Sequence, residues 1–138
     1  MMLFDDIIEL PDRPKLMSAA TLAYIGDSFY ELFIRTTLIE DKQKKPSKLH
    51  QAAIKYVNAG AQARLLEQLS DSLNQEEKSI VRRGRNADIN VPSSADAADY
   101  HYSTGFEALL GYLYLKGDDL RLEEILTEIK TILFNQQS

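Results

Sequence analysis

Two acidic residues lie in stretches that otherwise have the pattern of buried helices. Asp27 follows Gly26 in LAYIGDSFYELF, residues 22–33. The apolar residues of this stretch recur at three- and four-residue spacing, as one helix face would: Leu22, Ile25, Phe29, Leu32 and Phe33. Glu107 lies in a second apolar run, TGFEALLGYLYL, residues 104–115. Because burying an unpaired carboxylate is costly, each acid is expected to have a compensating partner.

A shared divalent cation would compensate both carboxylates. Small residues flank the two acids: Ala23 and Gly26 in the first run, Thr104 and Gly111 in the second. They would let two helices approach until both carboxylates reach one ion. Ligation by oxygen alone favours Mg²⁺, with Mn²⁺ as a substitute, over zinc. The alternative is that each acid projects into solvent from a helix less buried than the pattern indicates.

Glu31 and the two histidines are further candidates for the same site. Glu31, one helical turn after Asp27, would either accept hydrogen bonds around the ion or be a surface charge. His50 and His101 do not have the spacing of a zinc motif, and the chain has no cysteine. The chemistry therefore centres on the two carboxylates.

Two basic clusters could contact a polyanion. The first surrounds Pro46 and comprises Lys42, Lys44, Lys45 and Lys48. The second comprises Arg82, Arg83 and Arg85. Arginine matches phosphate oxygens well, and Gly84 within the second cluster would let the backbone approach the ligand. Taken alone, each cluster is also typical of a charged surface that keeps a protein soluble. Together with a magnesium site, the two clusters indicate phosphodiester chemistry.

Composition sets the class of protein. The chain has 138 residues, 44% of them hydrophobic and 27% charged, which fits one globular domain over residues 1–138. The formal net charge of −5 hides a basic middle, since residues 42–85 hold ten Lys/Arg against four Asp/Glu. The N-terminal MMLFDDIIEL lacks the lysines of a signal peptide, and no apolar run reaches membrane-spanning length. We expect a cytoplasmic protein with no membrane partner.

Hydrophobic periodicity predicts an all-α helical bundle. Helices are expected over about 18–40, 46–69, 74–82, 98–116 and 120–134, with a short helix before residue 17. Residues 82–97 have no helical period and predict a long surface loop. The residues expected to begin or end helices are Ser18, Pro46, Asn74 with Glu77, Gly117, and Asp118 or Asp119.

Three motifs occur in the order found in a known family. YIGDSFYE, RRGRN and TGFEALLGYLYL together resemble the catalytic domain of the ribonuclease III family, and its short bacterial branch in particular. The resemblance covers about residues 16–133, leaving no room for a C-terminal domain that binds double-stranded RNA. It implies a ribonuclease III-like endonuclease domain that forms a homodimer and cuts double-stranded RNA with Mg²⁺, each active site cutting one strand.

The resemblance also implies roles for the residues singled out above. Asp27 and Glu107 would hold the metal that activates water for in-line attack on phosphorus, giving 5′-phosphate products. The implied substrate is the precursor of large-subunit (23S) ribosomal RNA, and a ribosomal protein that presents this RNA is left open. The RNA contacts would come from the basic clusters, that is, from Lys44, Lys45, Lys48, Arg82, Arg83 and Arg85.

The sequence departs from the family pattern at two positions. The broader family has acids where this chain has Ala23 and Thr104. Water, the Thr104 hydroxyl or RNA phosphate oxygens would then complete the coordination, and either one or two ions could act. The missing acids also leave open a catalytically inactive RNA-binding or ribosome-assembly module. A helical dimer that serves only as a protein-interaction unit is the third alternative.

Overall fold

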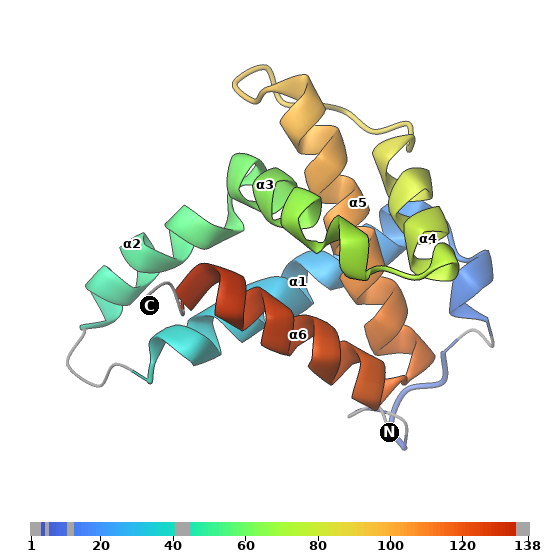
Figure 1. The fold of residues 1–138 in the computed structure, drawn as a ribbon, viewed down its shortest axis with the longest axis horizontal. Coiled ribbons are helices and arrows are strands. Elements are labelled where there is room, and N and C mark those ends of the chain that lie inside the picture. Colours follow the sequence, from blue (N-terminus) through green and yellow to red (C-terminus); the bar gives the residue numbers. More distant parts are fainter. Residues whose placement is uncertain (1–3, 5, 11–12, 41–44, 135–138) are drawn as a thin grey trace.

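The computed structural model describes residues 4, 6–10, 13–40 and 45–134. These residues form six α-helices and two short 3-10 helices without any strand, so the all-α prediction is confirmed (Figure 1). The elements are η1 (Pro14–Leu16), α1 (Ala19–Leu38), α2 (Pro46–Val57), α3 (Ala59–Leu69), η2 (Ser70–Ser72), α4 (Gln75–Arg85), α5 (Ala97–Lys116) and α6 (Asp119–Phe134). No helix in the described ranges is both long and apolar enough to cross a membrane.

The predicted helix ends are confirmed where side chains cap them. Ser18 accepts a hydrogen bond from the first turn of α1. Asn74 and Glu77 form both hydrogen bonds of a capping box at α4. Gly117 ends α5 with a φ of 76°, a left-handed conformation that favours glycine. Asp118 accepts the N–H of Arg121 in the first turn of α6, at 3.2 Å.

The helix predicted over 46–69 is in fact two helices, α2 and α3. The break falls at Asn58, whose ψ of 160° is extended. The Asn58 side chain accepts a hydrogen bond from Ala61 N at 2.8 Å and so begins α3. The prediction of one continuous helix was wrong because the alanine-rich composition hid this internal N-cap.

The loop after α4 is shorter than predicted. Helix α4 continues to Arg85, so all three arginines of the second basic cluster lie in its last turn rather than in a loop. Gly84 is buried against α5, and a Cβ there would lie 2.6 Å from Gly105 Cα. The prediction that Gly84 lets a polyanion approach the backbone was therefore wrong, because α5 occupies that space.

The buried face of α1 is rotated from the predicted one. It comprises Leu22, Ala23, Gly26, Tyr30, Ile34 and Leu38. Leu32, which was expected to be buried, is 65% exposed. The small residues Ala23 and Gly26 belong to the packing face although they contribute little hydrophobic signal, which is why counting large apolar residues misplaced it.

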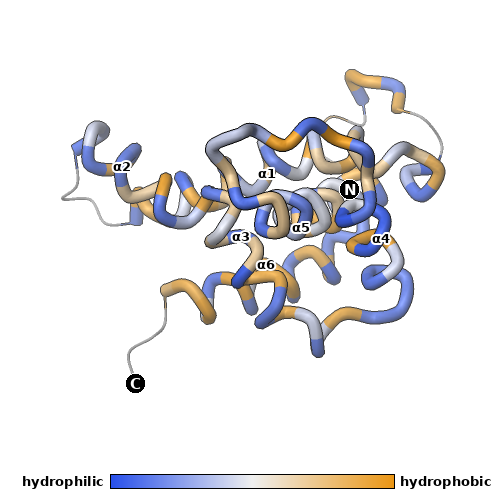
Figure 2. Tube along the Cα trace, turned by 90° about the horizontal axis from the view of Figure 1, so that it is seen from above, coloured by the Kyte–Doolittle hydropathy of each residue, from blue (hydrophilic) through white to orange (hydrophobic). Residues whose placement is uncertain are grey.

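Helix α5 is the central element of the core. It contacts α1, α3, α4 and α6, and it lies in the middle of the molecule in the view from above (Figure 2). Between Ser103 and Leu113 every residue is buried except Glu107, which is half-buried. A helix enclosed on most sides in this way positions its single acidic side chain by packing.

Helices α1 and α5 meet through two glycines. A Cβ built on Gly26 would lie 1.7 Å from the backbone oxygen of Glu107, and one on Gly111 would lie 1.9 Å from the backbone oxygen of Leu22. The two backbones therefore touch, as the small residues in the sequence predicted. This crossing places the residue after Gly26, Asp27, beside Glu107.

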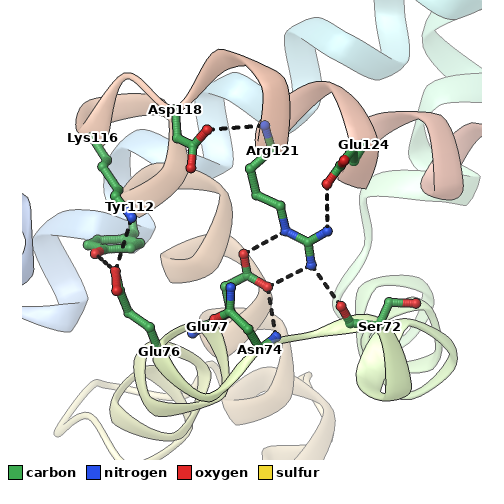
Figure 3. A network of polar contacts seen from close by, with 9 residues as sticks. All are labelled: Ser72, Asn74, Glu76, Glu77, Tyr112, Lys116, Asp118, Arg121 and Glu124. Carbon is green, nitrogen blue, oxygen red and sulfur yellow. Dashed lines mark hydrogen bonds and ion pairs between the residues drawn. The ribbon is translucent and has the colours of Figure 1, made fainter.

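A polar network attaches α6 to α4 (Figure 3). The Arg121 guanidinium donates to both oxygens of the buried Glu77 carboxylate, each at 2.8 Å, and to Ser72 O at 2.7 Å. Burial acts to raise the pKa of Glu77, but the hydrogen bonds from Arg121 and from the Asn74 backbone outweigh it and lower that pKa. The paired carboxylate thus remains ionised inside the fold.

The glycine crossing predicts a large difference between two Gly→Ala variants. Gly26→Ala should lower the free energy of unfolding by about 3 kcal/mol or more, because its Cβ overlaps backbone that cannot move independently. Gly60→Ala is the matched control, since its Cβ would meet the mobile ends of Arg64 and Asp99 at 3.3 Å. The control should change stability by less than about 1 kcal/mol. Urea unfolding of both variants would measure this, and equal stabilities would contradict the crossing.

Candidate active site

The structure brings Asp27 and Glu107 together, one on α1 and one on α5. Asp27 is exposed, so the prediction that its carboxylate is buried was wrong. Glu107 is half-buried and lies close enough to Asp27 for a carboxyl–carboxylate hydrogen bond. Burial therefore disfavours the ionised form of Glu107, while Asp27 is in contact with solvent.

A third residue, which sequence reasoning missed, contacts the acid pair. The Gln62 side chain on α3 is buried, and its Nε2 donates to Glu107 Oε2 at 3.2 Å and to Val57 O at 2.9 Å. The signal that could have revealed it is the N-cap at Asn58, which starts α3 one turn before Gln62. A polar residue in the alanine-rich run would then have been assigned to a buried face.

In the absence of a cation, the surroundings of Glu107 favour its protonated form. Burial, the negative charge of Asp27 and the hydrogen bond with Asp27 raise the pKa of Glu107 to about 8, and the Gln62 amide partly opposes this rise. At neutral pH Glu107 is therefore largely protonated. Two adjacent carboxyls that cannot both ionise cheaply form a site that a positive charge would stabilise.

The residues present fit a hard divalent cation that keeps several water ligands. The available ligands are the carboxylate oxygens of Asp27 and Glu107. Oε1 of Gln62, whose Nε2 contacts Glu107, is buried without a hydrogen-bond partner among the described residues. Leaving such an oxygen unpaired costs about 1–3 kcal/mol. No group of three or more acids and histidines suited to a metal occurs in the described ranges. One or two carboxylates with water is the usual environment of Mg²⁺ rather than of zinc.

The remaining residues proposed around the ion have other contacts. Ala23 is buried in the α1 packing face. The Thr104 hydroxyl is buried and donates to Tyr100 O at 3.0 Å. Glu31 pairs with Arg35 at 3.0 Å on the outer face of α1. The described contacts therefore bring none of these three side chains to the acid pair.

The two basic clusters do not form one surface. Lys42 and Lys44 lie outside the described residues. Lys45 precedes α2 and Lys48 is in its first turn, both exposed. The arginine cluster is on α4, and α2 and α4 lie at opposite ends of the molecule (Figures 1 and 2).

Within the arginine cluster the side chains differ. Arg83 donates to Lys15 O at 2.9 Å and to Met17 O at 2.5 Å, which fixes the segment before α1. Arg85 is exposed and lies over the Tyr102 ring, 4.4 Å from its centroid. Arg82 is exposed as well. Arg82 and Arg85 are accessible to a ligand, whereas the guanidinium of Arg83 is occupied by the backbone.

Arg82 and Arg85 line a groove of about 510 Å³ between α3, α4 and the start of α5. Two further cations line it, Arg64 and Lys78, which sequence reasoning missed. The other lining residues are Ala63, Leu66, Glu67, Ser70, Leu73, Val81, Asp99 and Tyr102. Residues 78, 82 and 85 recur at helical spacing, a signal that could have placed Lys78 on the same face of α4. The groove shares α5 with the acid pair and α3 with Gln62, which contacts that pair.

Comparison with known proteins identifies the family. The family model described as the Ribonuclease III domain matches residues 20–118, which include both acids and the α1–α5 crossing. The chain therefore belongs to the ribonuclease III family, a family of endoribonucleases.

Individual relatives locate the chain within this family. A Mini-ribonuclease 3 from Symbiobacterium thermophilum is 49% identical over 115 residues, covering 83% of this chain and 88% of the relative. A Mini-ribonuclease 3 from Brevibacillus brevis is 43% identical over 126 residues, covering 91% and 94%. The crystal structure of a protein from Fusobacterium nucleatum superposes with a TM-score of 0.75 at 26% identity, over 83% of this chain and 92% of that one. The resemblance read from the three motifs is thus confirmed, and it is to the Mini-ribonuclease 3 branch.

The raised pKa of Glu107 predicts a specific pH dependence without divalent cations. Below its ordinary pKa of about 4.5, Glu107 is protonated in both the folded and the unfolded chain. As the pH rises from about 4.5 toward about 8, the unfolded chain loses this proton while the folded chain still holds it. The free energy of unfolding therefore decreases over this pH range. With EDTA present, the melting temperature of the wild type should fall between these pH values relative to that of Glu107→Gln, which cannot ionise.

Thermal unfolding by circular dichroism at several pH values would measure this difference. Glu31→Gln is the matched control, because Glu31 is a partly exposed acid on the surface of α1. Its curve should run parallel to that of the wild type. Parallel curves for wild type and Glu107→Gln would show that Glu107 ionises as an ordinary surface acid.

Proposed function

We propose that this protein is a metal-dependent endoribonuclease that cleaves double-stranded RNA. The observation that carries the proposal is the pair formed by Asp27 and Glu107, held together where α1 and α5 cross and contacted by Gln62. Membership of the ribonuclease III family supplies the reaction class, hydrolysis of a phosphodiester bond. The pair supplies two adjacent carboxylates in a setting that disfavours charge on both.

In this proposal Asp27 and Glu107 hold Mg²⁺, and Mn²⁺ can replace it. The bound ion supplies Lewis-acid chemistry, making water a better nucleophile and neutralising charge on the departing 3′ oxygen. Glu107 would have to lose its proton to act as a ligand, and Asp27 is the more exposed of the two residues. Because Ala23 carries no acid and the Thr104 hydroxyl donates to the backbone, water and RNA phosphate oxygens complete the coordination.

The RNA contacts come from the exposed cations on both sides of the acid pair. On one side the groove presents Arg64, Lys78, Arg82 and Arg85. On the other, α2 presents Lys45 and Lys48. A-form RNA is bound mainly through its phosphates and 2′-hydroxyls, which suits separated cations better than a single base-reading pocket. A homodimer as the active form and precursor 23S ribosomal RNA as the substrate in the cytoplasm are proposed from the family likeness.

The nuclease proposal is tested with long duplex RNA and Mg²⁺. Wild-type protein should shorten the duplex, while Asp27→Asn and Glu107→Gln should reduce the cleavage rate by at least about a hundredfold, since each removes a metal ligand. Both changes preserve size, so folding should be retained. Gel analysis of the products over time, with EDTA as the metal-free control, measures the rates.

Each alternative outcome has a distinct meaning. Binding of duplex RNA without cleavage by the wild type would replace the proposal with an inactive RNA-binding module. Neither binding nor cleavage would favour a protein-interaction role. Cleavage that both variants retain would show that the acid pair is not the catalytic site.

The RNA contact is tested by the salt dependence of binding. Arg82→Ala and Arg85→Ala should each weaken duplex binding and reduce the slope of log K against log salt by about 1, because each removes one phosphate contact. Arg83→Ala is the neighbouring control and should leave the slope unchanged, since its guanidinium binds Lys15 O and Met17 O. Fluorescence anisotropy with a labelled duplex measures all three. A slope altered by Arg83→Ala alone would remove the groove from the interface.

A further inference from the structure

Gln62 is the polar residue whose burial the rest of the fold explains least. It is 2% exposed and lies on α3, facing Glu107 of α5. The break at Asn58 determines its surroundings. Because the α-helix stops there, the carbonyl of Val57 points to Gln62 Nε2, five residues later, instead of continuing a helical ladder.

The contacts of Gln62 fix which way its amide points. Val57 O is a carbonyl and can only accept, so the atom 2.9 Å from it must be Nε2. The other hydrogen of Nε2 is directed to Glu107 Oε2 at 3.2 Å. Both N–H groups are therefore used, whatever the protonation state of Glu107. The amide immobilises one oxygen of the half-buried carboxyl.

The carbonyl half of the same amide has no hydrogen-bond donor within the part of the chain that the structure describes. Gln62 Oε1 is buried, and no donor reaches it from the described residues. It belongs to the same amide group whose Nε2 contacts Glu107 Oε2. A buried oxygen that can only accept, on the same amide that contacts Glu107, suits a donor that arrives with a ligand. The water molecules of a hydrated cation are such donors, and Mg²⁺ dehydrates reluctantly.

We propose that Gln62 is a positioning residue of the cation site, acting through both ends of its amide. Nε2 holds Glu107 in the orientation that binds the ion, and Oε1 accepts a hydrogen bond from a water molecule of the ion's hydration shell. Hydrogen bonds of this kind beyond the direct ligands commonly change metal affinity by about 10- to 100-fold. This inference rests on the proposed function, because it requires that Asp27 and Glu107 bind a divalent cation.

The test measures Mn²⁺ binding directly, by the electron paramagnetic resonance signal of free Mn²⁺ in titrations of the intact protein. Gln62→Met keeps the length of the side chain but removes both hydrogen-bonding ends. It should weaken Mn²⁺ binding about tenfold or more and lower kcat with little change in the KM for duplex RNA. Gln68→Met is the matched control, as Gln68 is exposed on the same helix, and it should leave these quantities unchanged.

The readouts separate positioning from a purely structural role. Positioning predicts that Gln62→Met retains a melting temperature near that of the wild type in EDTA but loses Mn²⁺ affinity. A lowered melting temperature with unchanged affinity would overturn the inference. If wild-type binding of Mn²⁺ is lost in Asp27→Asn but is normal in Gln62→Met, this inference alone fails. If Asp27→Asn binds Mn²⁺ as the wild type does, the proposed cation site itself fails.

A second measurement on the wild-type chain does not depend on how Gln62→Met folds. In ¹⁵N-labelled protein, the side-chain amide resonances of Gln62 should exchange slowly with solvent, shift on addition of Mg²⁺ and broaden at low Mn²⁺. The side-chain amide resonances of Gln68 should show none of these three effects. Unchanged Gln62 resonances in a protein whose Asp27 backbone signal shifts with Mg²⁺ would overturn the inference.

Discussion

The contact between the backbones of α1 and α5 is the constraint on which the site depends. With glycine at both positions 26 and 111, no side chain separates the two helices at their crossing. This contact determines the positions of both acids. Asp27 is the residue after Gly26, and the backbone oxygen that Gly26 touches belongs to Glu107. Any residue with a Cβ would move the helices apart and change the distance between the carboxyls. The glycines therefore determine the geometry of the acids more than the acids' own side chains do.

The site combines a fixed acid with an accessible one. Glu107 is held by burial in α5 and by the Gln62 amide, whereas Asp27 lies on the exposed side of α1. The packing that fixes Glu107 also raises its pKa, so the fold opposes the charge that the proposed chemistry requires. In the proposed function, a bound cation would offset this electrostatic cost, because it would favour the ionised form of Glu107.

Features encoded by neighbouring residues could be predicted from the sequence, and features that depend on distant contacts could not. The caps at Ser18, Asn74 and Gly117 are local hydrogen bonds or backbone conformations, and the acid pair was found because each acid interrupts an apolar run. Arg83 looked identical to Arg82 in sequence, yet its partners are carbonyls more than sixty residues away. Gln62 was missed for the same reason, since its role depends on a helix break and on a carboxyl 45 residues later.

Helix α6 contacts a helix at each end of the molecule. Near its start, Arg121 is bound to Glu77 of α4, and at its end the Phe134 ring packs on Tyr56 of α2, with ring centroids 4.8 Å apart. These are the two helices that carry the separated groups of exposed cations. These two attachments add to the packing of α2 on α1 and of α4 on α5, which holds the two groups of cations apart. A helix that contributes no residue to the acid pair thus links the two helices that carry the proposed RNA contacts.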